Sequence, residues 1–123
     1  MQVKALVWLG VKTPQFEAMT KLYRDVMGLP AYQADEVSSR FTLPNGTEVH
    51  VYGPRDDDHD FFGPGPVVGF LVDDVEAARA EMAAAGVTFI GDVQRSATHV
   101  WNHFRAPDGN VYELMAERSA DPA

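Results

Sequence analysis

The chain has 123 residues, enough for one domain with its own core, and its hydrophobic fraction of 46% is ordinary for a globular protein. The formal net charge of −8 argues against a nucleic-acid partner, because neutralising phosphates requires a basic patch, but it is compatible with a neutral or cationic small molecule. The absence of cysteine excludes disulfides, thiolate catalysis and zinc–thiolate sites. No apolar run approaches the ~18 residues of a membrane span and no signal-peptide pattern opens the chain, so we expect a cytoplasmic protein without a membrane partner.

The first predicted elements are a buried strand and an amphipathic helix. Residues 3–11 are almost continuously apolar, which is typical of a strand buried on both faces. Thr13 followed by Pro14 predicts a helix start, since threonine caps free backbone N–H groups and proline suits the first turn. Apolar residues then recur at helical spacing, and Gly28 ends the helix.

Three short strands and a polar loop complete the first half. We expect strands at residues 31–37, 38–43 and 47–52, with Pro44-Asn45-Gly46 as the hairpin turn before the last of them. The following loop, residues 53–66, is rich in Asp, Gly and Pro. Its acidic run, Asp56-Asp57-Asp58 with His59 and Asp60, offers ligands for a cation, although such runs are more often simply solvated.

The second half repeats this plan. A strand is expected at residues 67–72, and Asp74 caps a helix that runs to Ala85 and ends at Gly86. Three more strands are expected at about 87–94, 98–105 and 110–116, with Pro107-Asp108-Gly109 as the last turn. The tail, residues 119–123, is predicted to be frayed.

An internal duplication explains why the two halves agree. Residues 41–51 recur 63 positions later as residues 104–114, each copy a strand, a Pro-Asn/Asp-Gly turn and a second strand. Each second strand carries a potential metal ligand at the same place, His50 in one copy and Glu113 in the other. We therefore predict module one at residues 1–54, an intermodule loop at 55–64 and module two at 65–118, each with the order βαβββ.

This order predicts an α+β domain in which a helix covers one face of each sheet and the two sheets form an open, barrel-like groove. Strand alternation puts Glu48, His50 and Tyr52 on one face. A three-residue turn at residues 107–109 would pair His103 with Glu113 and put Trp101 on the same face, whereas a two-residue turn would put Phe104 there. The residues predicted to line the groove are Trp8, Arg40, Glu48, His50, Tyr52, Val67, His99, Trp101, His103 and Glu113. Aromatic walls with a few polar groups are typical of a small-molecule site.

Three segments carry a resemblance to a known family: residues 16–29, residues 67–75 and residues 104–114. In these segments the chain resembles the vicinal oxygen chelate superfamily, which contains glyoxalases, bleomycin-resistance proteins and extradiol dioxygenases. The resemblance implies paired βαβββ modules and a homodimer whose grooves are built from modules of both subunits. It also implies a metal site with one ligand on the first and last strand of each module, and those positions here are Trp8, His50, Val67 and Glu113.

Two of the four implied ligand positions hold side chains that bind no metal. Indole and isopropyl groups cannot coordinate a cation, and catalytic zinc needs three protein ligands plus water. The superfamily also includes metal-free proteins that hold a cationic drug in an aromatic groove. We therefore predict a small-molecule-binding protein without a cofactor, in which Trp8 and Trp101 form apolar walls and His50, His103 and Glu113 make polar contacts.

Two enzymatic alternatives stay open at the level of the sequence. In the first, His50, His103 and Glu113 hold a single divalent metal ion in a rearranged site, since two histidines and a carboxylate suit non-haem iron, and the protein is a lyase, isomerase or dioxygenase. In the second, the protein is a metal-free enzyme in which His50 or His103 acts as acid or base.

Overall fold

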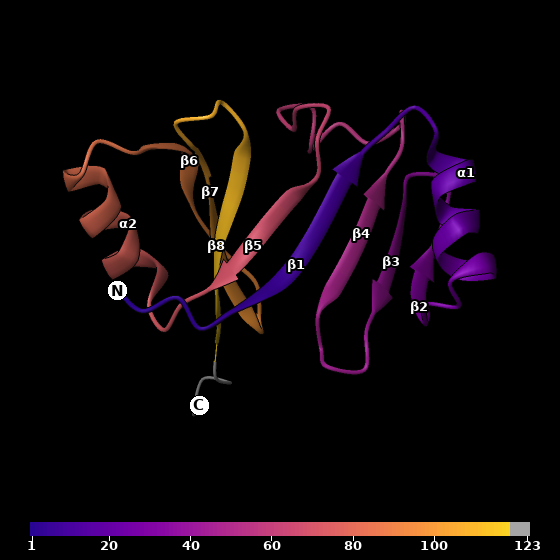
Figure 1. Ribbon diagram of the computed structural model, residues 1–123, viewed down its shortest axis with the longest axis horizontal. Coiled ribbons are helices and arrows are strands. Elements are labelled where there is room, and N and C mark those ends of the chain that lie inside the picture. The colour runs from indigo at the N-terminus through magenta and orange to yellow at the C-terminus, as the bar shows by residue number, and fades with distance from the viewer. Residues whose placement is uncertain (119–123) are drawn as a thin grey trace. The chain divides into compact units, whose positions relative to one another are not determined.

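The order βαβββ occurs twice in the computed structural model, which describes residues 1–118 (Figure 1). The strands are β1 (Ala5–Lys12), β2 (Ala31–Ala34), β3 (Ser38–Thr42), β4 (Glu48–Tyr52), β5 (Val67–Leu71), β6 (Thr88–Arg95), β7 (His99–Arg105) and β8 (Val111–Glu117). The helical segments are α1 (Phe16–Lys21), the π-helical turn η1 (Leu22–Val26) and α2 (Val75–Ala84). The predicted α+β class is confirmed, and the predicted tail at residues 119–123 lies outside the described residues.

The chain divides into two compact units. The first unit is Trp8–Val67, and the second unit combines Met1–Val7 with the chain from Val68 onward. Charged contacts join the N-terminal residues to the second unit, where the Met1 amino group lies 2.8 Å from Glu81 Oε2 and Lys4 Nζ lies 2.7 Å from Asp73 Oδ1. The repeat alone gave no sign of these contacts, because they join residues outside the matching segments.

In the first unit, the strands follow the order β2-β3-β4-β1, with β1 parallel to β4 and the other pairs antiparallel. Phe41, Val49 and Val51 form its core, and Phe16 and Met19 of α1 pack against them. The apolar stripe of the helix therefore covers the face of the sheet that carries the odd-numbered residues of β4.

Helix α1 differs from its prediction at the start. It begins at Phe16 rather than at Thr13–Pro14, since the Thr13 hydroxyl accepts the backbone N–H of Gln15 at 3.0 Å in a local turn. The predicted stop at Gly28 is confirmed, because this glycine has a φ of 70°, which suits a residue without a side chain.

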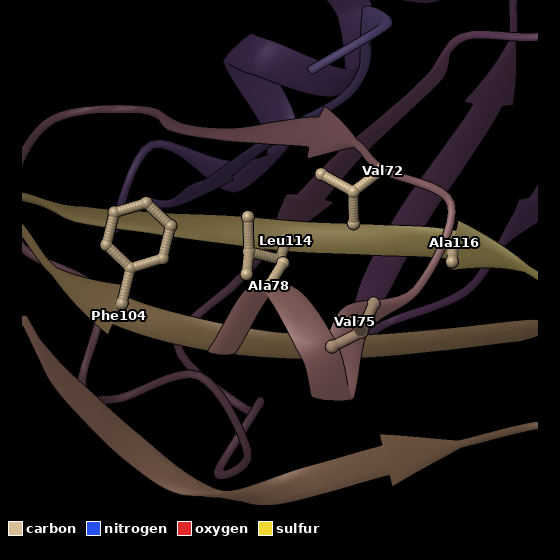
Figure 2. Close-up of a cluster of buried hydrophobic side chains, with 6 residues drawn as sticks. All are labelled: Val72, Val75, Ala78, Phe104, Leu114 and Ala116. Atoms are coloured by element: carbon tan, nitrogen blue, oxygen red, sulfur yellow. The ribbon is translucent and has the colours of Figure 1, made fainter. Parts of the chain in front are cut away.

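In the second unit, the strands follow the order β5-β8-β7-β6 with the same pattern of parallel and antiparallel pairs. Figure 2 shows its core, in which Val75 and Ala78 of α2 lie against Leu114 and neighbouring apolar side chains. The cap at Asp74 is confirmed, because its Oδ1 accepts the backbone N–H of Ala77 at 3.0 Å. Within residues 1–118, no helix is long and apolar enough to cross a membrane.

Strand β2 is shorter than the predicted strand at residues 31–37. It ends at Ala34, because Asp35 Oδ1 accepts the backbone N–H groups of Val37 at 2.8 Å and Ser38 at 2.9 Å. A side chain that bonds nearby backbone groups competes with strand pairing and favours a turn. The β2–β3 connection is therefore a tight turn, and β2 is a short edge strand.

Candidate functional site

In the first unit, polar and aromatic side chains lie on the face of the sheet opposite α1. The register of β3 with β4 pairs Arg40 with His50, as predicted, and β1 runs beside β4 with Trp8 opposite Glu48 and Gly10 opposite His50. Because side chains alternate along a strand, Glu48, His50 and Tyr52 point away from the core residues Val49 and Val51. We call this surface the polar face of the first unit.

His50 lies at the centre of a hydrogen-bonded chain on the polar face. Its Nδ1 lies 2.7 Å from the Tyr52 hydroxyl, and its Nε2 lies 3.2 Å from the Tyr32 hydroxyl. The Tyr32 hydroxyl in turn donates to Glu48 Oε1 at 2.8 Å. Since that proton is used, His50 Nε2–H donates to the Tyr32 oxygen and Nδ1 accepts from Tyr52, which assigns a neutral imidazole with its proton on Nε2.

The electrostatics agree with a neutral His50. The ring is 8% exposed, and burial together with the nearby positive charge of Arg40 lowers the pKa of His50 to about 4. Burial and the hydrogen bond to Glu48 raise the pKa of Tyr32 to about 12, so the phenol stays protonated. Near neutral pH, the polar face therefore presents a fixed donor–acceptor chain.

Acidification should destabilise the protein through His50. The unfolded chain binds a proton near pH 6.5 while the folded chain resists it to about pH 4, so stability is greatest above pH 6.5 and falls between these values. We expect a loss of about 2 kcal/mol between pH 7 and pH 4.5. Urea unfolding at both values should show this loss in the wild type and a clearly smaller loss in His50→Gln. Equal losses in the two proteins would contradict the assignment.

The Trp8 indole lies over Gly10 on the polar face. It is 6% exposed, and its ring centroid lies 5.2 Å from that of His50 in an edge-on arrangement and 6.1 Å from that of Phe62. A Cβ atom added to Gly10 would lie 2.0 Å from Cη2 of Trp8. The glycine therefore leaves the space that the indole occupies.

Gly10→Ala should displace this indole. We expect a loss of about 1–3 kcal/mol in the free energy of unfolding, because overpacking forces a buried ring out of its position. Fluorescence should show the Trp8 emission shifted to longer wavelength, measured in a Trp101→Phe background that leaves one tryptophan. Gly63→Ala is the control, since nothing lies within 4 Å of its added Cβ atom. An unshifted emission in Gly10→Ala would contradict the packing.

The acidic loop between the two repeats is not simply solvated. Asp56 is 4% exposed and accepts hydrogen bonds from Lys12 and from His59, whose Nδ1 lies 2.9 Å from Asp56 Oδ1. The His59 ring stacks on Tyr52 at a centroid distance of 3.6 Å. The expectation that the acidic run is simply solvated is therefore wrong for Asp56. Its buried carboxylate contacts the ammonium group of Lys12 on β1.

In the second unit, the corresponding strands bury a contact between a histidine and a glutamate. The register pairs His103 with Glu113 and Trp101 with Met115, which confirms the three-residue turn, whereas Phe104 lies in the core beside α2. His103 Nε2 lies 2.9 Å from Glu113 Oε2, and Glu113 is 3% exposed. Its second oxygen, Oε1, has no hydrogen-bond partner among the described residues. Burying a carboxylate costs free energy, and the contact with the histidine offsets part of that cost.

The predicted site residues thus fall into two sets, one in each unit. The polar face of the first unit carries Trp8, Arg40, Glu48, His50 and Tyr52, and the strand pair β7–β8 of the second unit carries His99, Trp101, His103 and Glu113. The tenth residue, Val67, is buried at the start of β5. That all ten line one groove stays a prediction.

Four residues of the first unit were not among those predicted to line the groove: Lys12, Tyr32, His59 and Phe62. Three of them are aromatic rings, and each has its ring centroid within 6.5 Å of that of His50 or Tyr52. Tyr32 comes from an edge strand whose register with β3 shifts between Ala31 and Gln33, so simple alternation could not place it. His59 and Phe62 lie in the loop, where no periodicity indicates direction.

A surface cleft of about 460 Å³ lies elsewhere, between α2 and β6 of the second unit. Three of its four charged side chains have protein partners. Arg95 bonds Glu76, and Arg79 bonds Asn102 and the Gly91 carbonyl. Both arginines of the cleft are therefore paired within the protein.

Three of the four implied metal positions are poorly suited to hold a cation. Trp8 and Val67 have no donor atom for a cation, and both ring nitrogens of His50 are hydrogen-bonded to tyrosines. Within residues 1–118, no three His, Cys, Asp or Glu side chains gather as a metal-binding group.

Comparison with known proteins gives a family match over most of the chain. The sequence profile of the Glyoxalase/Bleomycin resistance protein/Dioxygenase superfamily matches residues 5–114. No curated protein matches the sequence significantly.

Several solved structures share the fold. A Mn(II)-bound glyoxalase from Novosphingobium aromaticivorans is 20% identical with a TM-score of 0.75, and the match covers 99% of this chain but 42% of that one. Methylmalonyl-CoA epimerase from Mycobacterium tuberculosis is 18% identical with a TM-score of 0.71, covering 95% and 90% of the two chains. A superfamily member from Vibrio splendidus is 19% identical with a TM-score of 0.65, covering 94% and 99%. At these identities the likeness establishes the fold alone.

Proposed function

Because the chain belongs to the Glyoxalase/Bleomycin resistance protein/Dioxygenase superfamily, we propose that it is a small-molecule-binding protein without the four-ligand metal centre usual in that superfamily. The observation that carries the proposal is the environment of His50. Of the implied metal positions Trp8, His50 and Val67, only His50 has ring nitrogens that could bind a metal, and both of these are hydrogen-bonded to tyrosine hydroxyl groups of the protein.

The remaining chemistry of the polar face suits recognition of an organic molecule. Aromatic rings supply apolar contact, and a chain of hydroxyl, imidazole and carboxylate groups supplies directional hydrogen bonds. Tyr32 is 52% exposed, so part of its ring is accessible to a ligand.

Metal analysis of the protein tests the proposal directly. The protein is purified without a histidine tag, incubated with Mn²⁺, Fe²⁺, Ni²⁺ or Zn²⁺, desalted and analysed by mass spectrometry. We expect less than one metal ion per ten chains. One metal ion per chain, lost in both His50→Gln and Glu113→Gln, would overturn the proposal and support a metal-dependent lyase, isomerase or dioxygenase with a His50, His103 and Glu113 site.

A second candidate function rests on the free oxygen of Glu113. A buried carboxylate with one oxygen on His103 and the other without a hydrogen-bond partner among residues 1–118 is arranged to accept a proton from a bound molecule. The protein would then be a metal-free acid–base enzyme. The test is exchange, for deuterium, of the protons on the carbon next to the ketone of 2-oxo acids or next to the carbonyl of thioesters, followed by NMR. Exchange that persists unchanged in Glu113→Gln would exclude this function.

A further inference from the structure

Arg40 is a cation on the polar face that lacks a carboxylate partner. It comes from the middle of β3, opposite His50, and its Cζ lies 6.0 Å from the centre of the Tyr52 ring. Its Nε atom is buried and has no hydrogen-bond partner among residues 1–118, and no Asp or Glu of those residues lies within 4 Å of its guanidinium group.

Three of the four other long cations of the first unit have a carboxylate partner, and the fourth, Lys21, is exposed on α1. Lys12 contacts Asp56 and Asp60, Arg24 contacts Asp25 at 2.9 Å, and Arg55 contacts Glu36. These partners are found even though two of the three cations are largely exposed, where an ion pair contributes little. The partly buried Arg40 interacts with the Tyr52 ring and the Tyr32 hydroxyl, but no carboxylate of residues 1–118 lies within 4 Å of it.

Glu48 is the acidic group nearest in the register, but its oxygens are already engaged. Oε1 accepts from Tyr32, and Oε2 accepts from Thr42. Both oxygens of Glu48 are thus bonded to other groups, and Asp35, whose charge acts on Arg40 from beyond 4 Å, accepts from Val37, Ser38 and Gln33. No carboxylate of residues 1–118 therefore contacts the Arg40 guanidinium group directly. A buried N–H without an acceptor has lost its hydrogen bond to water and gained nothing in return.

We propose that the polar face of the first unit binds the carboxylate of a small organic acid, with Arg40 as its anchor. This inference rests on the proposed small-molecule-binding function and names its ligand class. The planar guanidinium fork presents parallel N–H groups that match the two oxygens of a carboxylate. The exposed ring of Tyr32, close to His50 on the same face, offers the apolar body of the acid a surface.

The surroundings favour a carboxylate monoanion over a phosphate. The Glu48 carboxylate lies on the same face, 3.6 Å from His50 Nε2, and it would repel the second charge of a phosphate dianion. The net charge of −8 does not prevent binding of a monoanion, since salt screens distant charges within about 8 Å at physiological ionic strength whereas the Arg40 contact is direct.

Calorimetry on the full chain tests this inference. The probes are acetate, benzoate and phenylacetate, with benzamide, benzamidine and inorganic phosphate as comparison compounds. We expect at least one carboxylate to bind, its amide not to bind, and Arg40→Met to weaken the affinity at least tenfold. Arg40→Lys should retain part of the affinity, because it keeps the charge but loses the fork. Arg24→Met is the matched control and should bind as the wild type does.

A stability measurement separates loss of the anchor from loss of the fold. Without ligand, Arg40→Met should unfold at the same temperature as the wild type or higher, because a buried donor without an acceptor has been removed. Binding of no carboxylate, undiminished binding in Arg40→Met, equal binding of benzamide, or tighter binding of phosphate or benzamidine would each overturn the inference. None of these outcomes changes the metal content, so the proposed function is judged separately.

Discussion

Replacing His103 with leucine should reduce the free energy of unfolding by about 3–5 kcal/mol. Glu113 is 3% exposed, and His103 is the partner that its Oε2 contacts at 2.9 Å. Leucine fills a similar volume but leaves the buried Glu113 carboxylate without a polar partner at Oε2. Urea unfolding at pH 7, monitored by circular dichroism, measures the effect.

A double variant tests whether the lost stability comes from leaving the Glu113 carboxylate without its partner. His103→Leu combined with Glu113→Leu should recover most of the lost stability, because replacing both partners of a buried pair leaves no charge to compensate. His99→Leu is the control on the same strand, where the histidine bonds the Thr98 hydroxyl and no buried carboxylate depends on it. A double variant as unstable as His103→Leu would show that the histidine stabilises the fold by other contacts.

Asp56→Ala should reduce the free energy of unfolding by about 3–4 kcal/mol. The carboxylate is nearly fully buried and accepts from the Lys12 ammonium group and from both the backbone and the ring of His59. Hydrogen bonds to charged groups stabilise more than neutral ones, and their loss leaves the partly buried ammonium of Lys12 with fewer acceptors. The His59 ring should also leave its position on Tyr52, which NMR ring-current shifts would report.

The neighbouring aspartate provides a matched control for this loop. Asp57→Ala changes the same residue type one position away, where the side chain is exposed, so the change in stability should stay within about 0.5 kcal/mol. Lowering the pH should also reduce the free energy of unfolding, as Asp56→Ala does. Although burial acts to raise it, the contacts with His59 and Lys12 hold the pKa of Asp56 below its usual value, so their stabilisation is lost only in strong acid. Equal stability of the two variants would mean that the loop is not held through Asp56.

Local rules identified the elements because the two halves of the chain obey them independently. The Asp74 cap, the Gly28 stop and the alternation along β4 each depend on contacts within a few residues, and each is confirmed. The rules erred where a side chain competed for backbone groups. Thr13 and Asp35 bond nearby N–H groups, and these bonds shift the start of α1 and shorten β2.

The sequence by itself determined the duplicated βαβββ plan, the faces that His50, Glu113 and their neighbours occupy, and the replacement of two implied ligands by Trp8 and Val67. Periodicity and repetition are properties of the chain, so they can be read without coordinates. Only the tertiary structure decided that Tyr32 and Tyr52 bond both ring nitrogens of His50, that Asp56 is buried beside Lys12, and that Arg40 Nε has no hydrogen-bond partner within residues 1–118. These facts depend on contacts between an edge strand, a loop and the sheet, whose partners are fixed by packing across distant segments rather than by any local pattern.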